Sequence, residues 1–274
     1  MRRMVALFIF ATVSVTLSGQ ADVVPSLDVV GIRIGMTVKE AATALRADNP
    51  RLMLTPSTRG LEGFAQPLLM SIAGQEGPVS GPNNTVERGG ENIELLFTTP
   101  PNPEVVWGIK RTYFFATKER PDLQITLDAM RKKYGPETIA PSPDPRDQTK
   151  FMAWVYDAQG KPMGPNGAQL NTMCAGLVTS RFGNGGITTE QEILTGQAGP
   201  APCQSISIVN ASIQSARLDP ANPQFVVFSL IVQITDARRH RAATDATRAV
   251  ALAATKARES KEAEEVKRRG APKL

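Results

Sequence analysis

The sequence predicts an α+β fold in which short helices pack on one face of an antiparallel sheet and a long C-terminal helix follows. Three observations predict this fold. Two short segments carry helix start and stop signals, several later segments alternate apolar and polar residues as strands do, and the final segment is rich in Ala, Arg, Lys and Glu. We expect a signal peptide over residues 1–21, a first α/β unit over 22–118, a second over 119–235 and a C-terminal helix over 236–274.

The N-terminus has the pattern of a cleavable secretory signal peptide. A basic pair at residues 2 and 3 precedes an apolar stretch over residues 4–17, and the small-residue triplet Gly19-Gln20-Ala21 places cleavage between Ala21 and Asp22. The alternative, a membrane anchor, is disfavoured because the apolar stretch has about 14 residues, fewer than the roughly 18 that span a bilayer. We therefore predict a periplasmic or secreted protein.

The charge of the chain is distributed unevenly. Residues 237–274 carry 11 Lys and Arg against 5 Asp and Glu, whereas residues 22–236 carry 18 against 21. The sequence pI of about 9.4 therefore describes a basic tail on a mildly acidic body. This distribution and the predicted compartment argue against nucleic acid as a partner.

The first helix is predicted within residues 31–50. Thr37 and Glu40 stand at the spacing of a capping box, and Asn49 followed by Pro50 is a stop signal. Apolar residues recur at helical spacing on one face, which we expect to pack on the sheet: Val38, Ala41, Ala42 and Leu45.

Residues 55–90 are rich in Gly, Pro, Ser and Asn, and we predict a long surface connection there, with one candidate strand at Pro67–Ile72. The triplet Asn83-Asn84-Thr85 fits the glycosylation acceptor pattern, which is common by chance. The next segments, Asn92–Thr98 and Glu104–Ala116, predict a hairpin. Its apolar residues alternate along the two strands: Ile93, Leu95 and Phe97 on the first, and Val105, Trp107 and Ile109 on the second.

The second helix is predicted within residues 120–137. Pro121 suits a first turn, Asp122 favours the positive end of a helix, and Gly135 closes it. The apolar face of this helix comprises Leu123, Leu127, Met130 and Tyr134.

After this helix, Phe151–Tyr156 is predicted as a strand. Asp157 is interpreted as a turn-forming side chain rather than a cation ligand, because no carboxylates follow it at calcium-loop spacing. Residues 162–202 are the least regular part of the body. Their Gly-rich run at 183–186 is interpreted as a turn, since it lacks the Lys-Ser/Thr pair of phosphate-binding loops.

Cys174 and Cys203 are the only two cysteines, and in an exported chain such a pair predicts a disulfide. The alternative is two free thiols of which one acts as a nucleophile. It is disfavoured because the only histidine, His240, lies in the charged tail.

Gln204–Gln214 and Gln224–Thr235 predict a second hairpin, whose last strand carries an apolar face: Val226, Phe228, Leu230, Val232 and Ile234. A PxNP turn precedes a valine-rich strand in both hairpins, at 100–103 and 220–223, which suggests a duplicated helix-plus-hairpin unit. From residue 236 to 269, alanine content predicts a long helix. Its apolar stripe is mostly alanine, so we expect it to project from the body or to pack loosely.

The segment GMTVKEAATAL at residues 35–45 resembles the motif that opens the small outer-membrane-assembly lipoproteins of the SmpA/OmlA type. The helix ending KKYGPE at 132–137 resembles that of related domains. A tandem of such units is similar to the β-lactamase-inhibitor-protein fold, in which helices pack on one face of an antiparallel sheet. The chain departs from the lipoprotein pattern because no cysteine for acylation follows its signal peptide. The resemblance implies a fold and a cell-envelope compartment.

No catalytic, cofactor-binding or metal-ligating set stands at recognisable spacing, so we predict no enzyme, no cofactor and no metal site. The leading hypothesis is a non-catalytic protein-binding module whose partner is an envelope protein. In a first alternative, the basic C-terminal helix docks on an anionic membrane surface, although it also fits a solvated helix. In a second, the protein is a carboxylate-based hydrolase whose Asp and Glu residues come together only in the fold.

Overall fold

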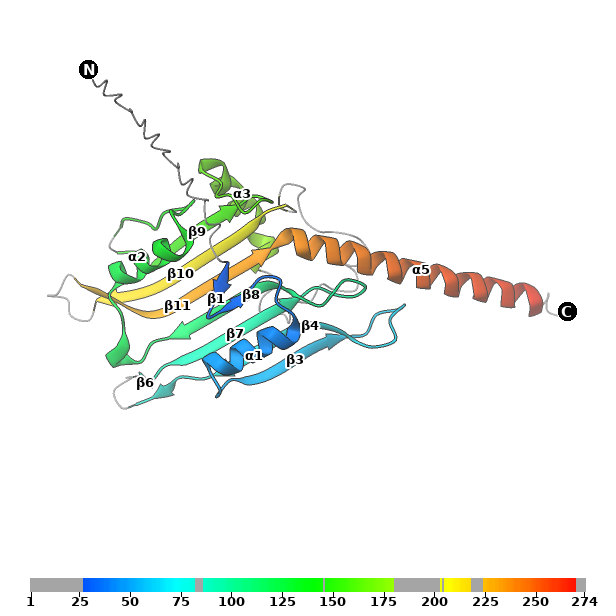
Figure 1. The fold of residues 1–274 in the computed structure, drawn as a ribbon, viewed down its shortest axis with the longest axis horizontal. Coiled ribbons are helices and arrows are strands. Elements are labelled where there is room, and N and C mark those ends of the chain that lie inside the picture. Colours follow the sequence, from blue (N-terminus) through cyan, green and yellow to red (C-terminus); the bar gives the residue numbers. More distant parts are fainter. Residues whose placement is uncertain are drawn as a thin grey trace, which may run out of the picture.

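The structure is a computed structural model that describes residues 27–81, 86–144, 146–179, 203, 205–217 and 224–269. Its strands are β1 (Asp28–Val29), β2 (Ile32–Arg33), β3 (Met53–Arg59), β4 (Leu68–Glu76), β5 (Val79–Ser80), β6 (Val86–Arg88), β7 (Gly90–Phe97), β8 (Val106–Phe114), β9 (Thr149–Tyr156), β10 (Ser207–Arg217) and β11 (Phe225–Asp236). Its helices are α1 (Val38–Asp48), the short 3-10 helix η2 (Thr117–Glu119), α2 (Leu123–Tyr134), α3 (Pro165–Thr179) and α5 (Ala237–Arg269), as labelled in Figure 1.

Seven strands form one antiparallel sheet in the order β3-β4-β7-β8-β11-β10-β9. The last strands of the two predicted units, β8 and β11, pair with each other inside this sheet and set Ile109 opposite Ile234. Both residues are fully buried. The predicted α+β class, with an antiparallel sheet and a long C-terminal helix, is confirmed.

The first helix has the predicted start and end. The Thr37 hydroxyl accepts a hydrogen bond from the backbone N–H of Glu40 (3.3 Å), and the Glu40 carboxylate accepts one from the N–H of Thr37 (2.9 Å). These reciprocal bonds form the capping box that the spacing predicts. The helix ends at Asp48, with Asn49 as its C-cap.

The second helix begins at an Asp122 cap, whose carboxylate accepts from the N–H groups of Gln124 (2.7 Å) and Ile125 (3.1 Å). It ends before Gly135, whose φ of +83° is a conformation that glycine adopts without steric cost. The predicted apolar face is confirmed, because Leu127, Met130 and Tyr134 are buried in the main core.

Helices α1 and α2 lie on the same side of the sheet, as Figure 1 shows. The main core fills the space between them and this face, and includes Ala41 and Leu45 from α1. Its largest fully buried side chains from the sheet include Trp154, Tyr156, Phe97, Leu95 and Ile213. The prediction of short helices on one face is therefore confirmed for these two.

Four residues of the predicted apolar faces, Val105, Trp107, Val226 and Phe228, lie outside the main core because the strands contain β-bulges. In β8 the register shifts opposite Leu96 and Phe97, so Trp107 packs against Leu96 on the other face, away from Ile109. In β11 the register shifts between its pairs with Gln214 and Ser215. Val227 therefore joins the main core in place of the predicted Phe228. A bulge inserts one residue and reverses the alternation beyond it.

The prediction of a surface connection over residues 55–90 is also wrong, because most of this segment is strand. β3 and β4 pair with each other, and β4 pairs with β7. Pro56 argued against a strand in this segment, because proline cannot donate a backbone hydrogen bond. A proline is tolerated in β3 because β3 is an edge strand of the sheet. The candidate strand predicted at Pro67–Ile72 is confirmed as the first part of β4, which continues through Gly74 to Glu76. At Gly74 an added Cβ would lie 2.9 Å from the Ile93 side chain.

The segment over 162–202, predicted to be irregular, begins with helix α3. Four features named above lie outside the described residues: the signal peptide with Ala21 and Asp22, the glycosylation triplet at 83–85, the Gly-rich run at 183–186 and the PxNP turn at 220–223. The Asp157 prediction is confirmed, since its carboxylate accepts from the N–H groups of Gln159 and Lys161 (both 2.9 Å) and closes the turn after β9.

Candidate functional site

We call the sheet face opposite α1 and α2 the open face, because several of its side chains are exposed. Strand register aligns its side chains in rows across all seven strands. The row that we call the central row comprises Met53, Gln75, Asn92, Thr112, Ile231, Ser212 and Phe151, in sheet order. Uncharged polar side chains and Ile231 thus lie between large apolar side chains at the two edges.

The apolar ends of the central row are exposed to solvent. Met53 is 72% exposed and Phe151 is 39% exposed, whereas Ile231 between them is half-buried. Full burial of a side chain of this size contributes roughly 1.5–3 kcal/mol, and Met53 forgoes more of this than Phe151. The two side chains lie on the same face, at the β3 and β9 edges of the sheet.

A shallow pocket of about 490 Å³ lies on the β3 side of the open face. Its lining includes Met53 and Thr112 of the central row, and also Glu94 and Lys110, which are register partners in the next row. Among the residues that line this pocket, the charged groups are the Glu94 carboxylate and the Lys110 ammonium group.

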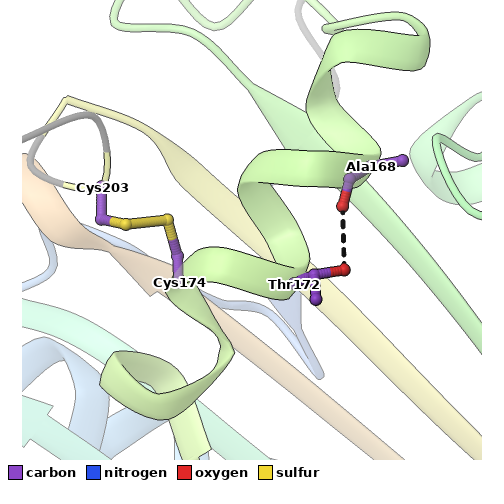
Figure 2. Close-up of a disulfide and its surroundings, with 4 residues drawn as sticks. All are labelled: Ala168, Thr172, Cys174 and Cys203. Atoms are coloured by element: carbon purple, nitrogen blue, oxygen red, sulfur yellow. Dashed lines mark hydrogen bonds between the residues drawn. A yellow bond between two sulfur atoms is a disulfide. The ribbon is translucent and has the colours of Figure 1, made fainter. Parts of the chain in front are cut away.

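One end of the open face is covered by α3 and the start of α5. On α3, Cys174 forms the predicted disulfide with Cys203, and their Cα atoms are 5.5 Å apart (Figure 2). Both cysteines are buried in a small cluster with Val155 of β9 and Ile208 of β10. The disulfide therefore fastens α3 to the sheet and, within the described residues, no free cysteine is present to act as a nucleophile.

The start of α5 covers the sheet next to β8. The His240 ring stacks on the Trp107 ring with 4.1 Å between their centroids, and the Trp107 Nε1 group donates to the carbonyl of Phe97 (3.1 Å). Two turns further along α5, the hydroxyl of Thr247 lies 2.7 Å from that of Thr99. His240 is thus part of the packing between helix and sheet, a contact that its position in a charged tail did not predict.

A second concave region, which we call the charged cleft, lies on the helix-covered side at the C-terminal end of α1. It has a volume of about 660 Å³ and contains carboxylates that the sequence keeps far apart, including Asp48, Glu76 and Glu91. These are the residues that a carboxylate-based hydrolase could use. However, the Glu91 carboxylate accepts hydrogen bonds from Arg111 and Asn49, an arrangement typical of charge pairing.

Across the residues that the structure describes, no group of three or more His, Cys, Asp or Glu side chains is placed to hold a metal ion. In the same ranges, no helix has the length and apolar character needed to cross a membrane.

Comparison of the chain with protein-family models, with curated proteins and with solved structures finds no match. The resemblance to the SmpA/OmlA-type lipoproteins and to the β-lactamase-inhibitor-protein fold therefore stays a prediction.

Proposed function

We propose that this protein is a non-catalytic binding module of the periplasm or the extracellular space, which contacts an envelope protein through its open face. The observation that carries the proposal is the central row, where polar side chains lie between exposed Met53 and Phe151. The disulfide of Cys174 and Cys203 supports an oxidising, exported location.

The geometry favours a face-on contact over strand addition at a sheet edge. At the β3 edge, Pro56 lacks an N–H to donate to an added strand. At the β9 edge, the backbone is already in use, because Ala153 exchanges hydrogen bonds with Ile139, and the N–H of Met163 donates to the carbonyl of Val155. A partner is therefore expected to pack on side chains of the open face.

The proposal is tested with a photo-crosslinking amino acid placed at single sites and expressed in the native envelope. Met53 and Phe151 are the test positions, and Ile125 on α2 is the matched control because it is 67% exposed on the helix-covered side. We expect one crosslinked protein from both test positions and none from Ile125. Equal crosslinking from all three positions, or crosslinking from Ile125 alone, would refute the open face as the contact surface.

A second candidate function concerns the C-terminal helix, which would dock on anionic lipid headgroups. The observation that favours it is the continuous exposure of α5 from Lys256 to Arg269, with three basic residues in its last turn. The chain ending at Ser260 removes all three of these basic residues and keeps the ion pair of Arg258 with Glu62. Salt-sensitive sedimentation with phosphatidylglycerol vesicles, lost in the shortened chain, supports docking, whereas no sedimentation of the full chain excludes it.

A further inference from the structure

Met53 is the most exposed methionine among the residues that the structure describes. It is 72% exposed, and Met173 on α3 follows at 43%. The remaining described methionines are buried or half-buried: Met36, Met70, Met130, Met152 and Met163. Water-soluble reagents therefore reach the Met53 side chain with the least obstruction from the fold.

The side chains next to Met53 on the open face are polar or small. Its register partner is Gln75 on β4, and Thr55 follows two residues along β3 on the same face. Met53 also lines the pocket of about 490 Å³, together with Ala73. Within the described sheet β3 is an edge strand, so only β4 flanks it. Met53 is therefore accessible both from the pocket and from the edge of the sheet.

The surroundings of a methionine determine what its oxidation does to a protein. Hydrogen peroxide, a two-electron oxidant, converts the thioether to a sulfoxide: the sulfur takes one oxygen atom, the O–O bond breaks and the peroxide is reduced to water. The polar product disrupts an apolar core. Three methionines lie in such cores and are at most 7% exposed: Met70, Met130 and Met152. Oxidation of any of these three is expected to destabilise the fold.

A sulfoxide at Met53 is compatible with the fold. Met53 belongs to none of the hydrophobic clusters formed by the described residues. The sulfoxide oxygen is a hydrogen-bond acceptor that water can solvate, and the Gln75 amide and the Lys110 ammonium group in the same pocket are donors. Oxidation of Met53 therefore makes the β3 end of the central row polar and leaves the core unchanged.

We propose that Met53 is a modification site, at which a two-electron oxidant such as hydrogen peroxide forms methionine sulfoxide while the protein stays folded. The disulfide of Cys174 and Cys203 supports an oxidising location, where such a modification is relevant. The modification is reversible, because methionine sulfoxide reductases return the sulfoxide to the thioether and oxidise a dithiol in exchange. A weaker contact of the oxidised open face with its partner is the consequence that rests on the proposed function.

Peptide mass spectrometry of the protein after exposure to hydrogen peroxide tests the proposal. Trypsin cuts after Arg51 and Arg59, so Met53 is the only methionine of its peptide, and tandem spectra separate the other sites. We expect oxidation in the order of exposure, with Met53 about tenfold faster than the three core methionines and Met173 in between. The melting temperature is expected to stay unchanged while Met53 is the only oxidised residue.

Met53→Leu and Met173→Leu are the matched variants, since each replaces an exposed thioether by an apolar side chain that peroxide does not oxidise. Met53→Leu is expected to remove the fastest oxidation, and Met173→Leu is expected to leave it unchanged. The proposal is overturned if Met173 or a core methionine is oxidised as fast as Met53. It is also overturned if the melting temperature falls when Met53 alone is oxidised.

Photo-crosslinking from position 151 tests the consequence for the open face separately. Because a sulfoxide at Met53 is polar, we expect oxidation to lower the crosslink about fivefold in the parent protein. In Met53→Leu the crosslink is expected to be the same before and after oxidation. An unchanged crosslink in the oxidised parent overturns the weaker contact. A crosslink that is absent even before oxidation refutes the proposed function, and the peptide spectra still decide whether Met53 is the modification site.

Discussion

At the scale of single residues, capping side chains are the features that the sequence predicts best. Thr37, Asp122 and Asp157 each accept hydrogen bonds from N–H groups no more than four residues away. Their partners are therefore contained in the local sequence. The position of Trp107 was predicted wrongly, because the bulge that turns it depends on how β7 pairs with β8.

Thr37→Ala is expected to lower the free energy of unfolding by about 1 kcal/mol, because it removes the acceptor for the Glu40 N–H at the start of α1. Thr43→Ala is the control, since the exposed Thr43 hydroxyl only donates to a carbonyl within the same helix. Urea unfolding of both variants measures the difference. If Thr43→Ala costs as much as Thr37→Ala, the capping box does not stabilise α1.

The ion pair between Arg131 and Glu137 predicts a pH dependence. Hydrogen bonds from the Arg131 guanidinium lower the pKa of Glu137, and burial opposes them. A carboxyl with a lowered pKa in the folded state stabilises the fold above its unfolded pKa, and this contribution is lost as the pH falls through the folded pKa. Glu137→Gln is therefore expected to cost about 1 kcal/mol at pH 7 and progressively less below about pH 4.

Urea unfolding at pH 7, 5 and 3 measures this difference. The control is Glu259→Gln on the exposed part of α5, for which we expect no change in the difference between these pH values. A cost for Glu137→Gln that stays constant down to pH 3 would contradict the assigned role of the ion pair.

At the scale of secondary-structure elements, α5 consists of two halves with different surroundings. Its first half is packed, with Ala243, Thr247 and Ala251 buried at successive turns. From Lys256 to Arg269 every residue is exposed, and Figure 1 shows this part extending away from the sheet. The expectation of a projecting or loosely packed helix thus holds for the second half, while the first half is closely packed through small side chains.

Ala251→Glu is expected to lower the free energy of unfolding by about 2–4 kcal/mol, because it places a charge against Leu61, Leu68 and Met70. Ala253→Glu is the matched control, since Ala253 is exposed on the same helix and the substitution is chemically identical. Thermal melts of the two variants compare the costs. Equal melting temperatures would show that the first half of α5 is not fixed to the body in solution.

At the scale of the whole molecule, one sheet joins the two predicted units, and this is the property that bears most on stability. The pairing of β8 with β11 buries Ile109 and Ile234 at the junction. Elements that share a continuous core are expected to unfold together. The chain contains two tryptophans, Trp107 in the first unit and Trp154 in the second, so each unit carries its own fluorescent reporter.

Ile234→Ala is expected to lower the free energy of unfolding by about 2–5 kcal/mol in both units at once. Trp107→Phe leaves Trp154 as the only reporter, and Trp154→Phe leaves Trp107, so urea unfolding can follow each unit separately by fluorescence. We expect the two reporters to shift equally when Ile234→Ala is added to each. A shift seen by Trp154 alone would show that the units unfold independently.

The sequence by itself determined the α+β class, the caps and faces of α1 and α2, both long hairpins, the cysteine pair and the long C-terminal helix. The helices, their caps and the hairpins depend on residues that are neighbours in the sequence. The disulfide depends on the fact that each cysteine has only one other cysteine with which to pair. Only the tertiary structure decided that β3 is a strand and that β4 continues to Glu76, that bulges turn Trp107 and Val227, and that Asp48, Glu76 and Glu91 share a cleft. The physical reason is that these features depend on how distant segments pair as strands. The register of that pairing, and which strands lie at the edges of the sheet, cannot be read from local sequence patterns.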